Sequence, residues 1–427
     1  MRPRLTRLVV ALTLAAGLCA GATACGAGQE PTVTIVVPWA DGGPEYGAFY
    51  NVVQPFAQSH HFQVKIISTP AFAQQLDVGE ATDDLPDLVD LPSPGAVAQY
   101  ENGFDGINLE PLSIGLRSYD QPWQSLAESA GTVYAVPIKA DVKSLIWYKT
   151  GALPGSDWAA LKSASVSGTP WCLGLANGSA SGWPGADWVA DILLSTYGPA
   201  AYESWLEGAW MSGQVANAWQ TWGMLIRDSA VVPAVPGGRL GALKTQFNDA
   251  IVGTGCELEH GALSATGLPS TVGYSYEQFP SISGRPAPVL VSGDFMGLFT
   301  NNPYARSLLQ YLATYTAQKS WVNQSGGYAF SADNAVQPDD YPPGVERKIA
   351  NLLQPGTGLT MCFSAEDTMT PDLSAAFEQA ILEYVNDPDV TFLDGLLKGL
   401  QQTANGELKG TQRAGEQQVE EKACDLP

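Results

Sequence analysis

The sequence predicts an α/β fold, because segments typical of strands and helices alternate along its first hundred residues. Residues 32–37 are nearly all β-branched, and strand-like runs return at 62–67 and 85–91. Between the first two runs, residues 45–56 carry apolar side chains at helical spacing. Ligands of α/β sheets bind beyond the carboxyl ends of the strands, so the loops after these strands are the first candidates for a functional site.

The pattern changes further along the chain and predicts a second domain. Strand-like runs at 132–138 and 144–148 are followed by mainly helical segments between residues 186 and 248. The change places the start of the second domain near residue 141. Residues 371–386 form the clearest helix pattern, in which Thr370 can cap the first turn.

Length and composition limit the classes of protein to consider. A chain of 427 residues suggests two or three compact parts at roughly 150 residues each. Hydrophobic residues make up 45% of it, with 12 Trp, so the chain is globular rather than disordered. The 43 acids against 21 bases leave a net charge of -22, which repels phosphate backbones and anionic lipid headgroups. We therefore expect no nucleic-acid partner and no electrostatic membrane docking.

The first residues are typical of an export signal. Three arginines within the first seven residues precede an apolar run at 8–22, and residues 1–24 contain no acid. The run is shorter than the roughly 20 apolar residues that span a bilayer. It ends in small residues before Cys25, an order that resembles a bacterial lipobox, so we expect lipidation of Cys25 and a tether at 25–31. The alternative is a simple secretory signal that is cleaved near the same place.

Four further cysteines predict disulfide bonds. An even number in an exported protein favours disulfides over a metal site, and we expect no metal because the histidines lack zinc-site spacing and no CxxC occurs. Three pairings are possible. We expect Cys172 with Cys256 and Cys362 with Cys424. The second pair would hold the polar tail at 401–427, and loop closure of this size is worth roughly 4 kcal/mol.

Motifs of the common enzyme classes are missing. The sequence has no GxxxxGK[ST], no strand-linked GxGxxG and no HExxH, so we expect no cofactor. The nearest approach to a GxSxG elbow has Ala180 at the nucleophile position, and His60, His61 and His260 are expected to be structural. Glycoside hydrolysis needs only two carboxylates roughly 5 to 10 Å apart, so a glycosidase remains the enzyme alternative.

Several loops combine tryptophan with carboxylates, the mixture that suits a sugar. Indole rings stack on the apolar faces of sugars, and carboxylates accept hydroxyl protons. We expect Trp147 and Trp188 in cores, whereas Lys139 and Lys143 are either solvated or paired with acids. Asp90 either contacts a ligand or caps the next helix. The candidate ligand residues in these loops are Trp39, Asp41, Glu45, Asp90, Ser93, Asp141, Trp183 and Asp187.

Four segments together resemble one known family. They are residues 85–95 (LPDLVDLPSPG), 131–148 (GTVYAVPIKADVKSLIWY), 170–191 (PWCLGLANGSASGWPGADWVAD) and 363–389 (FSAEDTMTPDLSAAFEQAILEYVNDPD). The chain is similar there to the extracellular solute-binding proteins of carbohydrate ABC importers, the group that includes maltose-binding and α-glucoside-binding lipoproteins. The resemblance extends over most of the chain after the signal.

The resemblance implies a two-lobed fold of the type II periplasmic-binding class, with a hinge and a ligand cleft between the lobes. One lobe would hold residues 32–138 and 285–330, and the other residues 139–284 and 331–427. It implies a non-enzymatic monomer, lipid-anchored to the outer face of the cytoplasmic membrane. Such a protein would capture a neutral sugar or oligosaccharide and deliver it to the transmembrane subunits of an ABC permease.

The resemblance also implies roles for single residues. Asp141 matches a sugar-binding carboxylate, and the Trp183 loop matches a loop that bears a ligand-contacting aromatic residue. Glu257 replaces the tryptophan of the family's Cys-Trp-Leu-His pattern and is a further candidate ligand residue, without the stacking ring of the family. The remaining matches are Gly293 and Asp294 in a site strand and Gly327 in a site turn.

Overall fold

The computed structural model describes most of the chain after residue 29. The described residues are 30–69, 71–103, 107–114, 116–119, 123–129, 132–152, 155–167, 171–227, 239–414 and 422–424. The chain divides into two units, Met1–Glu30 and Pro31–Pro427, and the described helices and strands belong to the second. The predicted signal and Cys25 lie outside the described residues. No helix among the described residues is long and apolar enough to span a membrane.

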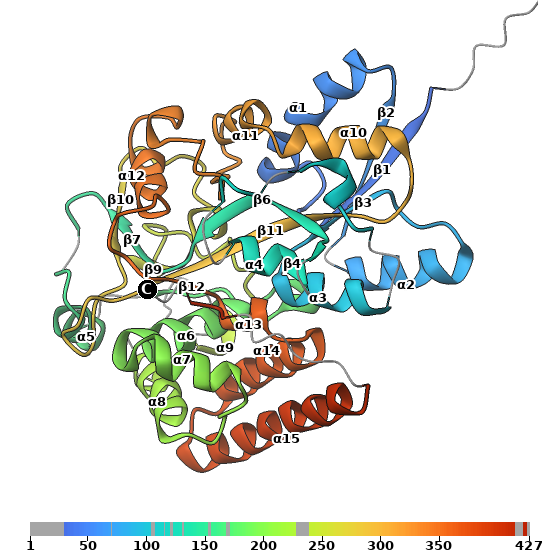
Figure 1. The fold of residues 1–427 in the computed structure, drawn as a ribbon. Helices are drawn as coiled ribbons and strands as arrows, with labels where there is room; N and C mark the ends of the chain where they lie inside the picture. The colour runs from blue at the N-terminus through green and yellow to red at the C-terminus, as the bar shows by residue number, and fades with distance from the viewer. Residues whose placement is uncertain are drawn as a thin grey trace, which may run out of the picture. The chain divides into compact units, whose positions relative to one another are not determined.

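Most of the strands that the sequence predicts in the first part of the chain lie in one six-stranded sheet. Strand β1 pairs in parallel with β2 and β3, while β11 pairs antiparallel with β3 and β6 and in parallel with β12. Helices α1, α10 and α11 pack beside it (Figure 1). The strands are β1 (Thr32–Val37), β2 (Gln63–Ser68), β3 (Leu88–Leu91), β6 (Ala135–Val142), β11 (Val289–Leu298) and β12 (Met361–Phe363).

A second sheet has four strands in the order β10-β7-β9-β8, and its strand β7 comes directly after β6 in the chain. Its strands are β7 (Leu145–Lys149), β8 (Trp171–Cys172), β9 (Leu258–His260) and β10 (Tyr274–Gln278). A group of helices packs together in the lower part of Figure 1. They are α6 (Trp183–Tyr197), α7 (Pro199–Leu206), α8 (Gly213–Arg227), α14 (Pro371–Asn386) and α15 (Val390–Ala414).

The remaining elements are short or cover the edges of the two sheets. The helices are α1 (Pro44–Ser59), α2 (Phe72–Thr82), α3 (Pro94–Gly103), α4 (Trp123–Ala127), α5 (Trp158–Ser167), α9 (Arg239–Ala242), α10 (Pro303–Leu312), α11 (Tyr315–Val322), α12 (Val345–Leu352) and α13 (Ala365–Thr368). Strands β4 (Glu128–Ser129) and β5 (Thr132–Val133) form a hairpin. Single 3₁₀ turns lie at Glu110–Leu112, Gly178–Ala180, Leu263–Ala265 and Pro338–Asp340.

Most of the expected elements are present, with different bounds in two places. The predicted cap on α14 is confirmed, because the Thr370 hydroxyl accepts from the Leu373 N–H at 3.4 Å. Residues 139–142, expected as a connector between two strands, lie in β6, because β6 continues its pairing with β11 as far as Val142. The helical pattern at 240–248 forms only the short helix α9.

Both predicted disulfides are present, Cys172–Cys256 and Cys362–Cys424. The second joins β12 to residues near the C-terminus, where the Phe363 N–H also donates to the Ala423 carbonyl at 2.7 Å. This pair therefore holds Ala423 and Cys424 against the six-stranded sheet.

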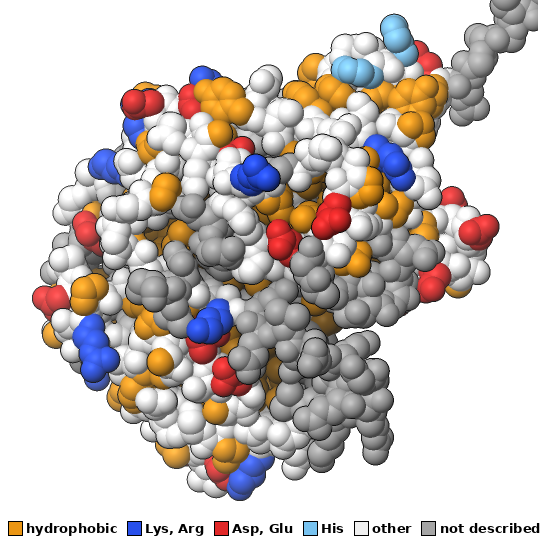
Figure 2. Space-filling model, viewed as in Figure 1, with side chains coloured by type: hydrophobic (Ala, Val, Ile, Leu, Met, Phe, Trp, Pro, Cys, Tyr) orange, Lys and Arg blue, Asp and Glu red, His pale blue; other side chains and the backbone are white. Residues whose placement is uncertain are grey.

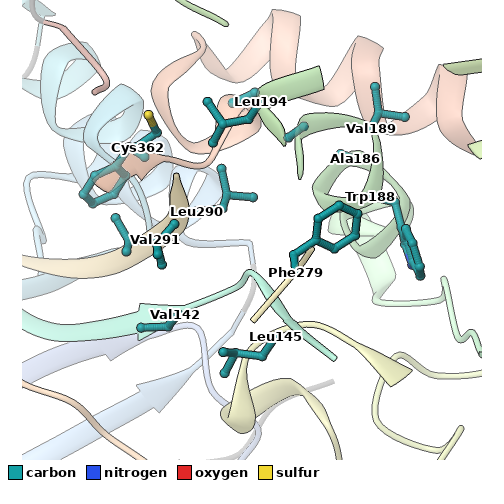
Figure 3. Packing of buried hydrophobic residues seen from close by; sticks show 14 of the residues in the cluster. Val142, Leu145, Ala186, Trp188, Val189, Leu194, Phe279, Leu290, Val291 and Cys362 are labelled. Carbon is teal, nitrogen blue, oxygen red and sulfur yellow. The ribbon is translucent and has the colours of Figure 1, made fainter. Parts of the chain in front are cut away.

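The core joins the ends of β6, β7 and β11 to helix α6. Figure 3 shows Val142, Leu145, Leu290 and Val291 from the strands near Ala186, Val189 and Leu194 of α6. Trp147 and Trp188 are buried, as predicted for core residues. On the face in Figure 2, charged side chains are scattered singly or in small groups.

Candidate functional site

A buried lysine on β6 collects acidic side chains from three elements. The Lys139 Nζ lies 2.7 Å from Glu45 Oε1 and 2.8 Å from Asp141 Oδ2. Asp294 Oδ2 is 3.6 Å away. Lys139 and Asp141 share a face of β6 by the two-residue period, and Asp294 pairs with Lys139 in the register with β11. We call these four residues and Asp90 the Lys139 cluster.

Asp90 on β3 is fully buried, and among the described residues neither of its carboxyl oxygens has a hydrogen-bond partner. Burial, helped by the charge of Asp294, raises the pKa of Asp90 well above its usual value. Burial also raises the pKa of Asp294 to about 6, although Lys139 opposes the shift. The cluster therefore holds one ammonium group and four carboxyl groups, more acid than its cation can neutralise.

Two further features define the electrostatics of the Lys139 cluster. The Ser264 hydroxyl donates to Asp141 Oδ1 at 2.9 Å and brings the 3₁₀ turn at Leu263–Ala265 to the cluster. Burial disfavours the charged form of Lys139, but Asp141, Glu45 and Asp294 together raise its pKa well above the usual value. Burial raises the pKa of Glu45 and Lys139 opposes it. Lys139 is thus a permanent cation.

A second buried lysine, four residues along the chain, forms another network. The Lys143 Nζ lies 3.1 Å from Asp187 Oδ1, 2.9 Å from Glu366 Oε1 and 3.2 Å from Asp367 Oδ2. The Ser364 Oγ is within hydrogen-bond distance of Lys143, Asp187 and Glu366. We call these five residues the Lys143 cluster. It ties the start of β7 to α6 and α13.

Burial also dominates the pKa values around the Lys143 cluster. It raises the pKa of Asp367 to about 7 against the opposing charge of Lys143. It raises the pKa of Glu378, on α14, to about 8. Glu366 behaves differently, because Lys143 and hydrogen bonds from Asp187 and Ser364 outweigh its burial and lower its pKa.

A third buried group contains a serine, an aspartate and a histidine, but in the wrong order for nucleophilic catalysis. The Ser144 hydroxyl donates to Asp191 Oδ1 at 2.6 Å, and Asp191 Oδ2 lies 2.6 Å from His260 Nε2. A catalytic serine needs the histidine as its direct neighbour. The His260 ring packs on Trp188 with centroids 4.5 Å apart, so this histidine is structural, as predicted.

Comparisons with known proteins agree on one kind of protein. No family model matches the chain. The osmoprotective compounds-binding protein GgtB of Synechocystis sp. is 29% identical over 91% of this chain and 96% of its own length. The alpha-glucosides-binding periplasmic protein AglE of Rhizobium meliloti is 27% identical over 83% of each.

Solved structures of bacterial binding proteins share the fold. A chitin oligosaccharide binding protein superposes with a TM-score of 0.72 at 15% identity, over 89% of this chain and 99% of its own. The solute receptor AcbH superposes with a TM-score of 0.73 at 16% identity, over 88% and 99%. The chain is therefore similar in sequence to two binding proteins and shares the fold of solved solute-binding proteins. The predicted two-lobed, type II periplasmic-binding fold is confirmed.

The fold of this solute-binding protein brings six of the predicted ligand residues to the two lysine clusters. Glu45, Asp90, Asp141 and Asp294 lie in the Lys139 cluster. Asp187 is in the Lys143 cluster, and the Trp183 ring lies beside it, with its centroid 5.4 Å from the Lys143 Nζ. Trp183 is the first residue of α6 rather than part of a loop.

Other predicted residues lie elsewhere in the solute-binding protein. Trp39 is buried in the core, where its ring packs against Phe49 and Trp321. Asp41 and Glu257 are exposed to solvent and form neither cluster. The Ser93 hydroxyl accepts from the Ala96 N–H at 3.1 Å and caps α3.

The two predicted glycines are sites of close packing. A side-chain carbon at Gly293 would lie 2.5 Å from the Trp123 ring and 2.7 Å from the Lys139 carbonyl oxygen. Gly327 packs against Ala48 of α1 in the same way. Gly293 thus lets Trp123 approach β11 directly beside the Lys139 cluster.

Besides the two lysines, four residues of the two networks had no assigned site role in the sequence: Ser264, Ser364, Glu366 and Asp367. The first contacts Asp141 across 123 positions of the chain. Glu366 and Asp367 belong to the segment 363–389 that resembles the family, and this resemblance is the sequence signal that could have identified them. No local pattern shows that they face Lys143.

Proposed function

We propose that this solute-binding protein captures a neutral sugar or oligosaccharide of the α-glucoside kind and delivers it to an ABC import permease. The Lys139 cluster carries the proposal, because it gathers carboxylates from α1, β3, β6 and β11 around one site. Carboxylate oxygens accept hydrogen bonds from hydroxyl groups, which neutral sugars present around the ring. The names of both relatives, one for osmoprotective compounds and one for alpha-glucosides, support this class of ligand.

The ligand would bind between two lobes that close on it by a hinge movement. We assign residues 32–138 and 285–330 to one lobe and residues 139–284 and 331–427 to the other. The continuous passage from β6 into β7 supports a hinge near Asp141, since β6 belongs to one sheet and β7 to the other. Strand β12 returns from the C-terminal part to the first sheet, so the two lobes would share this edge.

Export and anchoring are part of the proposal. Two disulfides fit an oxidising location outside the cytoplasm, and AglE is named as a periplasmic protein. A diacylglycerol on Cys25 would anchor the protein to the outer face of the cytoplasmic membrane. The anchor would keep it near the transmembrane subunits of its permease.

A glycoside hydrolase is the competing function, since acids with raised pKa values, such as Asp294 and Asp90, also serve as general acids. Relatives that are named as binding proteins favour capture without chemistry. The two functions differ in one measurable respect, because only a hydrolase releases reducing sugar.

A thermal-melt screen tests the proposal on the purified protein without its signal. Trehalose, maltose and sucrose are each added, and the correct ligand at 100 times its Kd stabilises the protein by about 2.7 kcal/mol. Asp141→Asn should abolish most of this stabilisation, while Asp41→Asn, at an exposed position outside both clusters, serves as the matched control. A protein that no sugar stabilises, or that releases reducing sugar from glucosides, would refute the proposal.

A further inference from the structure

We propose that Lys139 is the positioning residue of the sugar site: its one ammonium group holds Glu45 and Asp141 in place as hydrogen-bond acceptors. The inference rests on the proposed function and deepens it. It assigns a role to a residue that acts through its neighbours.

The geometry directs Lys139 mainly to protein carboxylates. An ammonium group has three donors. Glu45 at 2.7 Å and Asp141 at 2.8 Å take two of them, while Asp294 Oδ2 lies 3.6 Å away, beyond hydrogen-bond distance. The Lys139 side chain is also only 5% exposed. Protein carboxylates take two of the three donors of this nearly buried ammonium group, so its main contacts are with Glu45 and Asp141.

Lys139 links acids from elements that lie far apart in the sequence. Glu45 lies in the first turn of α1, 94 positions before Lys139. Asp294 comes from β11, and Asp141 from β6 itself. A carboxylate that is held on two sides loses less conformational entropy when a ligand binds, which is the usual basis of preorganised affinity.

Several acidic groups face Lys139, and its ammonium group affects whether they stay ionised and can accept hydrogen bonds. Those charges are Glu45 of α1, Asp90 of β3, Asp141 of β6 and Asp294 of β11. Asp367 of α13 acts on Asp294 from the Lys143 cluster. Within this set Lys139 supplies the only positive charge, and an opposite charge at such distances lowers a carboxyl pKa by about 1 to 3 units. Without it, buried carboxyl groups would take up protons at higher pH and would turn from acceptors into donors.

Asp90 shows what happens to a carboxyl group that Lys139 does not contact. Both of its oxygens lack a hydrogen-bond partner among the described residues, and burial raises its pKa well above the usual value. Glu45 and Asp141, by contrast, each have one carboxyl oxygen in contact with the Lys139 ammonium group. Contact with Lys139 therefore distinguishes the positioned acids from the unpartnered one within a single group.

The test measures sugar affinity by calorimetry between pH 5 and pH 9. Lys139→Met and Lys139→Gln remove the charge, and Lys139→Arg keeps it. Lys319→Met is the matched control, because it removes an exposed lysine paired with Asp340, far from the cluster in sequence and bonding. The ligand is the sugar that gives the wild-type protein its largest melting shift.

We expect three results. The wild-type affinity falls below about pH 6 as Asp294 protonates. The uncharged variants bind about tenfold or more weakly at pH 7, and their loss of affinity begins about 1 to 3 pH units higher. Lys139→Arg keeps the wild-type pH profile even where its affinity drops, and Lys319→Met matches the wild type in both respects.

A merely structural Lys139 would change stability or affinity without moving the pH profile, and that outcome would overturn the inference while leaving the proposed function intact. If the uncharged variants do not fold, the wild-type profile decides, because a flat affinity between pH 5 and pH 8 also overturns it. A wild-type protein that binds none of the sugars would reject both the function and the inference.

Discussion

The two buried lysines at 139 and 143 are four residues apart, yet their surroundings differ in a way that separates binding from structure. Each Lys143 partner has at least one bonded carboxyl oxygen, whereas Asp90 in the Lys139 cluster has none among the described residues. The partners also differ in access to water: the Glu45 side chain is 28% exposed, and the Asp187 side chain 1%. The most exposed acid therefore belongs to the Lys139 cluster, which favours that cluster for ligand contact, while Asp187 Oδ2 and Glu366 Oε2 of the Lys143 cluster are buried without partners among the described residues.

The contacts of Lys143 support the structural role. It bonds Asp187, 44 positions away, and Glu366, 223 positions away, and so joins three distant parts of the chain at the start of β7. The predicted ligand role of Asp187 stays a prediction. Its burial and its bonds to Lys143 and Ser364 indicate that it positions α6 against α13.

Removal of Lys143 should produce the largest effect of the variants considered. Lys143→Met leaves Asp187, Glu366 and Asp367 buried without a cation, and the loss of one partner of a buried ion pair costs about 3 to 5 kcal/mol of unfolding free energy. Urea unfolding measures the loss, with the exposed Lys319→Met as control. A Lys143→Met protein of normal stability that no longer binds sugar would show that the two clusters have the opposite roles.

The pH dependence of stability should distinguish the two clusters next. The folded-state pKa of Asp367 is about 7, above the usual 3.8, so the folded protein holds this proton more tightly than the unfolded chain. Its contribution is therefore favourable below about pH 4 and is lost as the pH rises toward 7. Asp367→Asn should flatten the decline in unfolding free energy between pH 5 and pH 8 by at least about 1 kcal/mol.

Asp340→Asn is the control for this measurement. Asp340 has a lowered pKa through Lys319 and backbone contacts that outweigh its burial, so its protonation affects stability only below about pH 4. The decline between pH 5 and pH 8 should persist in that variant. If the unfolding free energy of Asp367→Asn declines with pH as steeply as that of the wild type, Asp367 is charged throughout this pH range. Burial then does not raise its pKa in the folded protein as expected.

Local pattern predicted the elements, but long-range pairing decided the site. The β-branched run at 32–37 and the capped helix at 371–386 form as expected, because strand propensity and capping depend on adjacent residues. Trp39, expected to contact ligand, lies instead between Phe49 and Trp321, since α1 and α11 pack over it. No adjacent residue reveals that packing.

The acids of the Lys139 cluster show the same limit. Asp90, Asp141 and Asp294 each follow from a loop or strand end that the sequence marks, and the family resemblance singled out two of them. The sequence left open whether Lys139 is solvated or paired with acids, because its pairing with Asp294 depends on the register of β6 against β11, about 150 positions apart. Register is set by turns and core packing over that whole distance.

The smallest predicted effect concerns the orientation of one acceptor. Ser264→Ala removes the hydroxyl that donates to Asp141 Oδ1 and leaves Lys139 in contact with Oδ2. Sugar binding should weaken by about 1 kcal/mol, or about fivefold, with the pH profile unchanged because no charge is lost. Ser283→Ala, which removes a hydroxyl that bonds the Ser195 carbonyl, is the matched control in calorimetry. If Ser264→Ala binds like the wild type while Lys139→Met does not, Lys139 alone orients Asp141 and the 3₁₀ turn at Leu263–Ala265 makes no contribution to the site.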